Sequence, residues 1–259
     1  LVRELHAAGL QTDIKLLVYD GDWDNTTYAE DIFEGESAAL VHGASFHCMR
    51  GAHSDTSLLA SLHRRFPTKE IHVSECSSHG PSNFAENLDW NLRSLLLPSL
   101  MSGARSVGHY NLVLDAHGGA HKGGCADCRG VVSLNNGSVT YNEDFYGLAH
   151  VGMGILPGAV VLQSTLLDGN DHRCMQGMAF KNPDGSVAVV MIVWCVEAYN
   201  WFTLQKGANQ VDVDLPPGVH TFLWPPLNSK QTKESLKHTT VDTTRTENLL
   251  AVEYDDDKM

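Results

Sequence analysis

The sequence has 259 residues, 42% of them hydrophobic, and its 18 Lys and Arg against 31 Asp and Glu give a net charge of −13. A chain of this length and hydrophobic content buries a sizeable core, which excludes disorder for most of it. The negative charge repels a phosphate backbone, so we expect no nucleic-acid partner. The longest apolar run, residues 188–196, is too short to cross a bilayer.

The two ends of the chain differ from its middle. Leu1 lies inside a helical pattern that stops at Gly9, with no initiator Met or signal peptide before it, so we expect a fragment or an internal start. From residue 228 to 259 apolar periodicity fades into Thr, Lys and acidic residues, which predicts a polar, mobile tail.

Strand-like and helical runs alternate between residues 14 and 115. Helical spacing of apolar residues predicts helices over 57–66 and 84–101. The strand-like runs are 14–18, 40–46, 70–76 and 104–114. Each is followed by polar residues, which is typical of a parallel α/β sheet or barrel. In a (β/α)8 barrel the active site forms at that end of the strands.

After residue 130 the pattern changes to short β-rich runs separated by turn sequences such as Asn135-Asn136-Gly137. The runs are 131–134, 159–166, 175–180, 187–193, 201–204, 211–215 and 220–224, with one helical run over 142–152. Such spacing predicts an antiparallel β-sandwich.

Glu75 is the sharpest single candidate for chemistry. It ends a predicted strand between Ser74 and Cys76, where a barrel enzyme places a nucleophile or an acid/base. The alternative is a surface Glu after a strand, because strand ends are commonly acidic.

An acidic loop surrounds Trp23 with Asp20, Asp22 and Asp24. Carboxylates accept hydrogen bonds from sugar hydroxyls and an indole face packs on C–H bonds, so the loop is suited to sugar binding. A solvated loop or a weak cation site is equally consistent with the spacing.

Two His and a Cys-x-x-Cys pair form a rival constellation. His117, His121, Cys125 and Cys128 would supply the four ligands of a structural zinc site. Because they lie in a Gly-rich loop, a local disulfide, paired thiols or an ordinary loop are the alternatives.

Cysteine number and sequons bear on the compartment. Six Cys in a chain this long do not make a disulfide scaffold. Asn25 and Asn136 begin Asn-x-Ser/Thr sequons, which permit glycosylation in a secreted protein.

A set of segments follows in order along residues 14–225. They are Asp20-Gly-Asp-Trp-Asp24, Phe46-His-Cys48, 66–76, 111–115, 124–132, 144–150, 157–159 and 182–185. Together they resemble glycoside hydrolase family 30, which includes glucosylceramidases and endo-β-1,6-glucanases. The resemblance implies a (β/α)8 barrel joined to a β-sandwich, with the four early strands as the fifth to eighth of the barrel.

On this basis we predict the second half of a (β/α)8 TIM barrel over residues 1–129, a β-sandwich over 130–227 and the tail over 228–259. The resemblance implies that Glu75 is the nucleophile of a retaining β-glycosidase, a mechanism that needs two carboxyl groups. The family's acid/base Glu follows an Asn after the fourth strand, and we find no Asn-Glu-Pro segment, so we expect no acid/base in this chain. We therefore expect the isolated chain to be inactive and poorly soluble.

The resemblance also implies the residues around the sugar. The substrate-binding candidates are Asp20, Asp22, Trp23, His47, Tyr110 and Asn111. Three positions depart from the family pattern: this chain has Gly21 where the family usually has His, Met49 where it has Tyr, and Tyr110 where it has Trp. We expect these changes to alter specificity or to reflect decayed activity.

The family's Gly-rich loop recurs without a metal, so the resemblance favours a disulfide between Cys125 and Cys128 and implies no metal or cofactor. The implied substrate is a β-glucoside, either a glucan or glucosylceramide, with membrane contact only for the glycolipid. We expect a secreted protein, with a lysosomal or other extracytoplasmic location as the alternative. A non-catalytic carbohydrate-binding remnant is the alternative to the enzyme.

Overall fold

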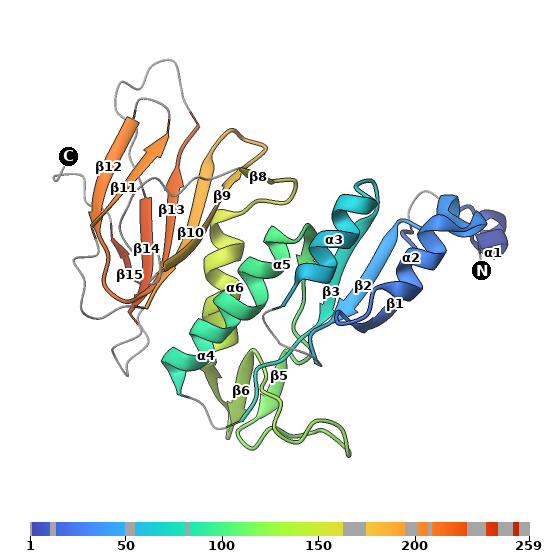
Figure 1. The fold of residues 1–259 in the computed structure, drawn as a ribbon. Helices are drawn as coiled ribbons and strands as arrows, with labels where there is room; N and C mark the ends of the chain where they lie inside the picture. The colour runs from blue at the N-terminus through green and yellow to red at the C-terminus, as the bar shows by residue number, and fades with distance from the viewer. Residues whose placement is uncertain are drawn as a thin grey trace. The chain divides into compact units, whose positions relative to one another are not determined.

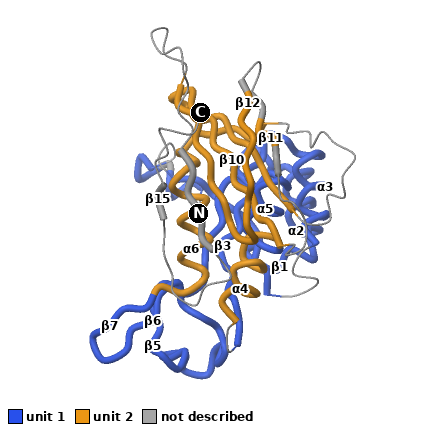
Figure 2. The backbone as a smooth tube through the Cα atoms, turned by 90° about the vertical axis from the view of Figure 1, so that its left-hand side faces the viewer, with its two compact units in different colours: residues 1–80, 94–140 blue, residues 81–93, 141–259 orange. Residues whose placement is uncertain are grey.

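The computed structural model describes residues 2–10, 14–49, 55–80, 83–162, 175–194, 201–206, 209–226, 237–242 and 251–253 (Figure 1). The chain divides into two compact units (Figure 2). Unit 1 comprises residues 1–80 and 94–140, and unit 2 comprises residues 81–93 and 141–259. The domain boundary expected between residues 129 and 130 stays a prediction.

Unit 1 is built on a four-stranded sheet in the order β1-β2-β3-β4, and every neighbouring pair is parallel. The strands are β1 (Leu17–Asp22), β2 (Gly43–His47), β3 (Glu70–Glu75) and β4 (Ala104–Val107). Phe46, Ile71 and Val73 are at most 1% exposed, as expected for the interior of a parallel sheet. The predicted parallel α/β sheet is therefore confirmed, and the carboxyl ends of its strands meet at one edge.

Helices accompany these strands. Helix α1 (Val2–Ala7) precedes β1, and α2 (Thr27–Glu34), η1 (Glu36–Leu40), α3 (Ser57–Arg65) and α5 (Leu97–Met101) lie between consecutive strands. The predicted helix over 57–66 is α3, which buries Leu59 and Leu62 on one face. Helix α2 was not predicted, although its buried residues Ala29 and Phe33 are four apart and so have helical spacing.

Gly43 allows β2 and β3 to approach closely at the start of β2. A Cβ atom at this position would lie 2.0 Å from the carbonyl oxygen of Glu70 on the neighbouring strand. Any side chain here must therefore push the two backbones apart.

The predicted strand over 104–114 is two strands. After β4, Gly108 passes close to the backbone of Ser74, and the Tyr110 amide donates to the carbonyl of Cys76 at 2.7 Å. A three-stranded sheet then follows in the order β5-β6-β7, with β5 parallel to β6. Its strands are β5 (Val113–Asp115), β6 (Val132–Asn135) and β7 (Ser138–Tyr141). The run 131–134 thus belongs to this sheet and not to the predicted sandwich.

Unit 2 contains a six-stranded sheet in the order β15-β14-β13-β10-β9-β8, in which each neighbouring pair is antiparallel. The strands are β8 (Val160–Leu162), β9 (Met175–Lys181), β10 (Val187–Val193), β13 (Gly218–Trp224), β14 (Lys237–Asp242) and β15 (Ala251–Glu253). A separate antiparallel hairpin pairs β11 (Trp201–Lys206) with β12 (Asn209–Asp214). A core cluster forms around Met191 and Phe222. These sheets confirm the predicted antiparallel β region.

Strands β14 and β15 correct part of the predicted tail over 228–259. Residues 237–242 pair with β13, and residues 251–253 pair with β14. The β-branched run Thr239, Thr240 and Val241 favours a strand although its neighbours are polar. The other tail residues lie outside the described part of the chain.

The predicted helix over 84–101 is three consecutive segments: α4 (Phe84–Trp90), η2 (Asn91–Leu96) and α5. The predicted helix over 142–152 is α6 (Glu143–Gly154), which contacts β10, β13 and α4 within unit 2. Asn91 Nδ2 donates to Asp144 Oδ1 at 2.7 Å, and both residues are at most 1% exposed. Among the described residues, none of the helices is long and apolar enough to cross a membrane.

Candidate active site

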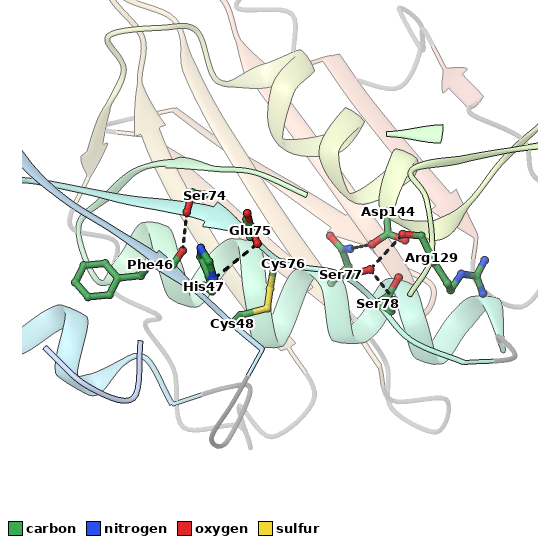
Figure 3. The surroundings of a disulfide bond; sticks show 11 residues. Phe46, His47, Cys48, Ser74, Glu75, Cys76, Ser77, Ser78, Arg129 and Asp144 are labelled. Carbon is green, nitrogen blue, oxygen red and sulfur yellow. Dashed lines mark hydrogen bonds and ion pairs between the residues drawn. A yellow bond between two sulfur atoms is a disulfide. The ribbon is translucent and has the colours of Figure 1, made fainter. Parts of the chain in front are cut away.

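Glu75 and His47 face each other at the carboxyl edge of the parallel sheet. Glu75 ends β3, His47 ends β2, and the two residues are paired in the strand register. His47 Nδ1 lies 3.7 Å from Glu75 Oε2 (Figure 3). The Glu75 side chain is 36% exposed and the His47 side chain 20% exposed. The edge therefore presents a solvent-accessible carboxylate beside a partly covered imidazole.

Asp20 contacts the other side of the same imidazole. Its Oδ1 lies 3.3 Å from His47 Nε2 and accepts hydrogen bonds of 2.8 Å from the hydroxyls of Ser45 and Ser74. These hydrogen bonds, first that of Ser74 and then that of Ser45, hold the pKa of Asp20 below its ordinary value. Asp20 is therefore anionic, and the His47 ring lies between two carboxylates, within hydrogen-bond distance of Asp20 and 3.7 Å from Glu75.

A bulge in β1 brings Asp20 to this position. The register between β1 and β2 shifts between Tyr19 and Gly21. Tyr19 and Asp20 both have positive φ, at 80° and 59°, which few non-glycine residues adopt. A Cβ at Gly21 would lie 2.8 Å from the Tyr19 ring, so the lack of a side chain at this position accommodates that ring. Bulges of this kind re-aim side chains next to functional sites.

A disulfide that sequence reasoning missed joins the two strand ends. Cys48 and Cys76, which directly follow His47 and Glu75, are bonded, with their Cα atoms 5.2 Å apart (Figure 3). Both are at most 1% exposed, and the Cys48 amide donates to the Glu75 carbonyl at 3.1 Å. The usable signal was the position of each Cys immediately after a strand end.

The other substrate-binding candidates are placed differently. Trp23 is 1% exposed, so its indole face is covered, and a sugar contact through it would require the ring to become accessible. Tyr110 is 51% exposed and its amide is tied to the end of β3. The carbonyls of Asp22 and Asn111 accept hydrogen bonds, from the Tyr19 hydroxyl at 3.1 Å and from the Val131 amide at 2.9 Å.

Glu70 lies at the opposite end of β3 from Glu75, and its carboxylate is surrounded by basic side chains. Its carboxylate lies 2.7 Å from Lys15 Nζ and 2.9 Å from Arg105. Burial acts to raise the pKa of Glu70, but hydrogen bonds from Lys15 and His72 and the charge of Arg105 outweigh it and leave the pKa below its ordinary value. A carboxyl group held ionised in this way is unsuited to act as a general acid.

The predicted four-ligand set of the Gly-rich loop is not assembled. Cys125 and Cys128 are disulfide-bonded, with their Cα atoms 5.4 Å apart. In the described part of the chain, the His and Cys ligand atoms that gather within 4.8 Å belong to His79, Cys125 and Cys128. His117 and His121 are exposed elsewhere in the loop. His79 precedes Cys125 by 46 residues and lies outside the loop, so spacing within the loop could not reveal it.

The two sequon residues are accessible. Asn25 precedes α2, and Asn136 lies in the turn between β6 and β7, with a positive φ of 46°. Both are exposed, as glycosylation requires.

Known proteins resemble this chain in sequence. It is 32% identical over 191 residues to the endo-1,6-β-D-glucanase BGN16.3 of Trichoderma harzianum and 29% identical over 190 residues to the endo-1,6-β-D-glucanase neg1 of Aspergillus fumigatus. Each alignment covers 72% of this chain and 37% of the relative. The chain thus spans little more than a third of the length of these relatives. No family model matches the sequence.

A solved structure supports the same relationship. The endo-β1,6-glucanase BT3312 superposes with a TM-score of 0.75 at 25% identity, over 87% of this chain and 51% of that one. The chain has a parallel sheet with an accessible carboxylate at its carboxyl edge, followed by an antiparallel sheet. Together with these relatives, this arrangement places the chain among homologues of glycoside hydrolases. Within that class it is a homologue of glycoside hydrolase family 30 across about 72% of its length.

Proposed function

We propose that this chain carries the nucleophile half of a retaining β-glycosidase active site, with Glu75 attacking the anomeric carbon. The observation that carries the proposal is the Glu75 carboxylate at the carboxyl edge of the parallel sheet, 3.7 Å from His47. An accessible carboxylate held beside an imidazole supplies the type of nucleophile that glycosyl-enzyme formation requires.

The finer fold assignment belongs to the same proposal. Strands β1 to β4 correspond to the fifth to eighth strands of a (β/α)8 barrel, and the antiparallel strands of unit 2 form a β-sandwich. In such a barrel Glu75 would end the seventh strand. The support is the order of four parallel strands and the similarity to BT3312 over half of that chain.

A retaining mechanism needs a second carboxyl group about 5 to 5.5 Å from the first, to protonate the leaving oxygen and later activate water. We assign that acid/base to sequence outside this chain. His47 and Asn111 would shape the site, and Asp20 and Tyr110 would bind sugar hydroxyls and ring faces.

The proposed substrate is a β-1,6-linked glucan, supported by the names of the two fungal relatives and of BT3312. Glucosylceramide is the second substrate that the family resemblance implies. The proposed compartment is extracytoplasmic, supported by the two disulfides, which form and persist in oxidising surroundings.

Mechanism-based labelling tests the nucleophile. The full-length parent protein is incubated with an activated fluorosugar β-glucoside, digested and mapped by mass spectrometry. We expect one glycosyl adduct on Glu75, which Glu75→Gln removes. Glu36→Gln, an exposed carboxylate change in unit 1, is the matched control and should keep the adduct.

Two outcomes would contradict the proposal. An adduct on another carboxylate would assign the nucleophile elsewhere. Sugar binding by calorimetry without any adduct would instead support a non-catalytic carbohydrate-binding remnant, which the three departures from the family pattern favour.

A further inference from the structure

The loop after β3 and the Cys125–Cys128 turn are held together by backbone hydrogen bonds within unit 1. His79 and Cys128 form an isolated antiparallel bridge. The Gly80 amide donates to the Asp127 carbonyl at 2.9 Å, and the Arg129 amide donates to the Ser78 carbonyl at 3.0 Å. The imidazole of His79 is therefore fixed beside the Cys-x-x-Cys sequence by the backbone.

The side chains converge with the spacing of a tetrahedral metal site. His79 Nδ1 lies 3.8 Å from Cys125 Sγ and 3.5 Å from Asp127 Oδ1. Asp127 Oδ1 lies 3.3 Å from Cys125 Sγ. Zinc bonds of about 2.3 Å to sulfur and about 2.0 to 2.2 Å to nitrogen and oxygen place neighbouring tetrahedral ligands about 3.3 to 3.8 Å apart. The spacing among these three side chains matches that range.

Cys128 Sγ lies within 4.8 Å of the His79 ring nitrogen but is bonded to Cys125 Sγ, so the two sulfur atoms must separate before both can bind a metal. We propose that, when the disulfide is reduced, His79, Cys125, Asp127 and Cys128 form a zinc site. The oxidised pair excludes the metal because bonded sulfurs are not thiolate ligands. The Cys-x-x-Cys turn is then closed by a disulfide in oxidising surroundings, and in the reduced chain zinc would join this turn to His79 across the loop junction.

Zinc fits this donor set better than harder cations do. Two thiolates and an imidazole are ligands that select zinc, whereas calcium and magnesium prefer oxygen. Cys128 is 2% exposed, while the side chains of His79 and Asp127 are 41% and 68% exposed. The site is thus anchored on its sulfur side and open to metal entry on the other.

The chemistry balances without a cofactor. A phosphine reductant supplies two electrons to the disulfide and is itself oxidised to a phosphine oxide, with water as the source of the oxygen. The two protons of that water end on the sulfurs as thiols. Zinc then replaces those two protons as it binds, so binding releases protons to the buffer.

The test measures metal binding and does not depend on glycosidase activity. The 259-residue chain is reduced with a phosphine, loaded with Zn²⁺, and desalted without oxygen, and bound zinc is counted by atomic emission. We expect one more zinc per chain than in the Cys125→Ser/Cys128→Ser variant, which corrects for other thiols. Co²⁺ should give the visible bands of a tetrahedral thiolate site in the parent chain only.

Single substitutions identify the nitrogen ligand. His79→Ala should weaken zinc binding at least about tenfold, because even groups that only support a ligand contribute that much. His117→Ala, in the same loop but outside the cluster, is the matched control and should bind as the parent does. Equal zinc in the parent and the double Ser variant overturns the proposal. So does a loss of affinity on changing His117 and not His79.

Discussion

The disulfide between Cys48 and Cys76 should contribute most of its stabilisation through the unfolded chain. The two residues are 28 apart in the sequence, whereas Cys125 and Cys128 are 3 apart. In the chain-entropy model, closing these loops lowers the entropy of the unfolded chain and stabilises the fold by about 3.6 and about 1.6 kcal/mol, respectively. Removing the longer cross-link should therefore cost about 2 kcal/mol more than removing the shorter one.

Hydrogen exchange measures this difference inside unit 1. The variants are Cys48→Ala/Cys76→Ala and, as the matched control, Cys125→Ala/Cys128→Ala. The slowest amides of β2 and β3 exchange through global opening, so their protection reports the free energy of unfolding. We expect the first variant to speed their exchange by roughly 400-fold and the control by roughly 15-fold, since about 1.4 kcal/mol is a factor of ten.

The comparison can refute the reasoning directly. Equal acceleration in both variants would mean that loop length does not set the stabilisation. A larger effect in the control would mean that the loop junction near His79 matters more to unit 1 than the junction beside Glu75.

Two further changes test the packing and the charges of the edge. Gly43→Ala should destabilise unit 1 by about 3 kcal/mol or more, since its Cβ would overlap the Glu70 carbonyl, whereas Gly152→Ala, with open space around it, should be neutral or stabilise by up to about 1 kcal/mol. Denaturant titration of both variants checks this, and equal midpoints would contradict it. Ser74→Ala should raise the pKa of Asp20 toward its ordinary value, as measured by carboxyl NMR titration. Because the folded pKa of Asp20 is depressed, its contribution to stability is present above the unfolded pKa and is lost as the pH falls through the folded one, and Ser74→Ala should reduce that loss. An unchanged pKa would refute the role of the Ser74 hydroxyl.

The sequence predicts those parts of the fold in which local pattern and tertiary burial agree. Leu59 and Leu62 have helical spacing and are both buried, so α3 was predictable. The buried residues of α2, Ala29 and Phe33, are four apart and also have helical spacing, so the pattern indicated this helix too and it was missed. The run over 104–114 reads as one strand because nothing in its apolar content shows that Gly108 passes against the backbone of Ser74.

The candidate site also contains residues that the sequence predicts and contacts that it does not. Glu75 and His47 were predictable, because each ends an apolar run and the carboxyl ends of parallel strands meet. Asp20 was a candidate because it lies in the acidic loop around Trp23. Its hydrogen bonds from Ser45 and Ser74 were not predictable, because a bulge in β1 brings Asp20 to those hydroxyls. The approach of His79 to Cys125, 46 residues away, was not predictable, because a non-local bridge between two loops creates it.

Glu75 ends a strand that pairs with both of its neighbours, which bears on whether half of the proposed catalytic pair can form alone. Strand β3 is paired to β2 up to Glu75 and to β4 up to Val73, so it is not an edge strand of this sheet. Beyond the strand, the Cys48 amide binds the Glu75 carbonyl and the Tyr110 amide binds the Cys76 carbonyl. The disulfide covalently joins the residues that follow His47 and Glu75. The proposed nucleophile, fixed by its own sheet in this way, would be positioned before substrate arrives, as electrostatic preorganisation requires. The geometry of Glu75 and His47 should therefore persist whether or not the second carboxyl group is present, and only the reaction depends on that second group.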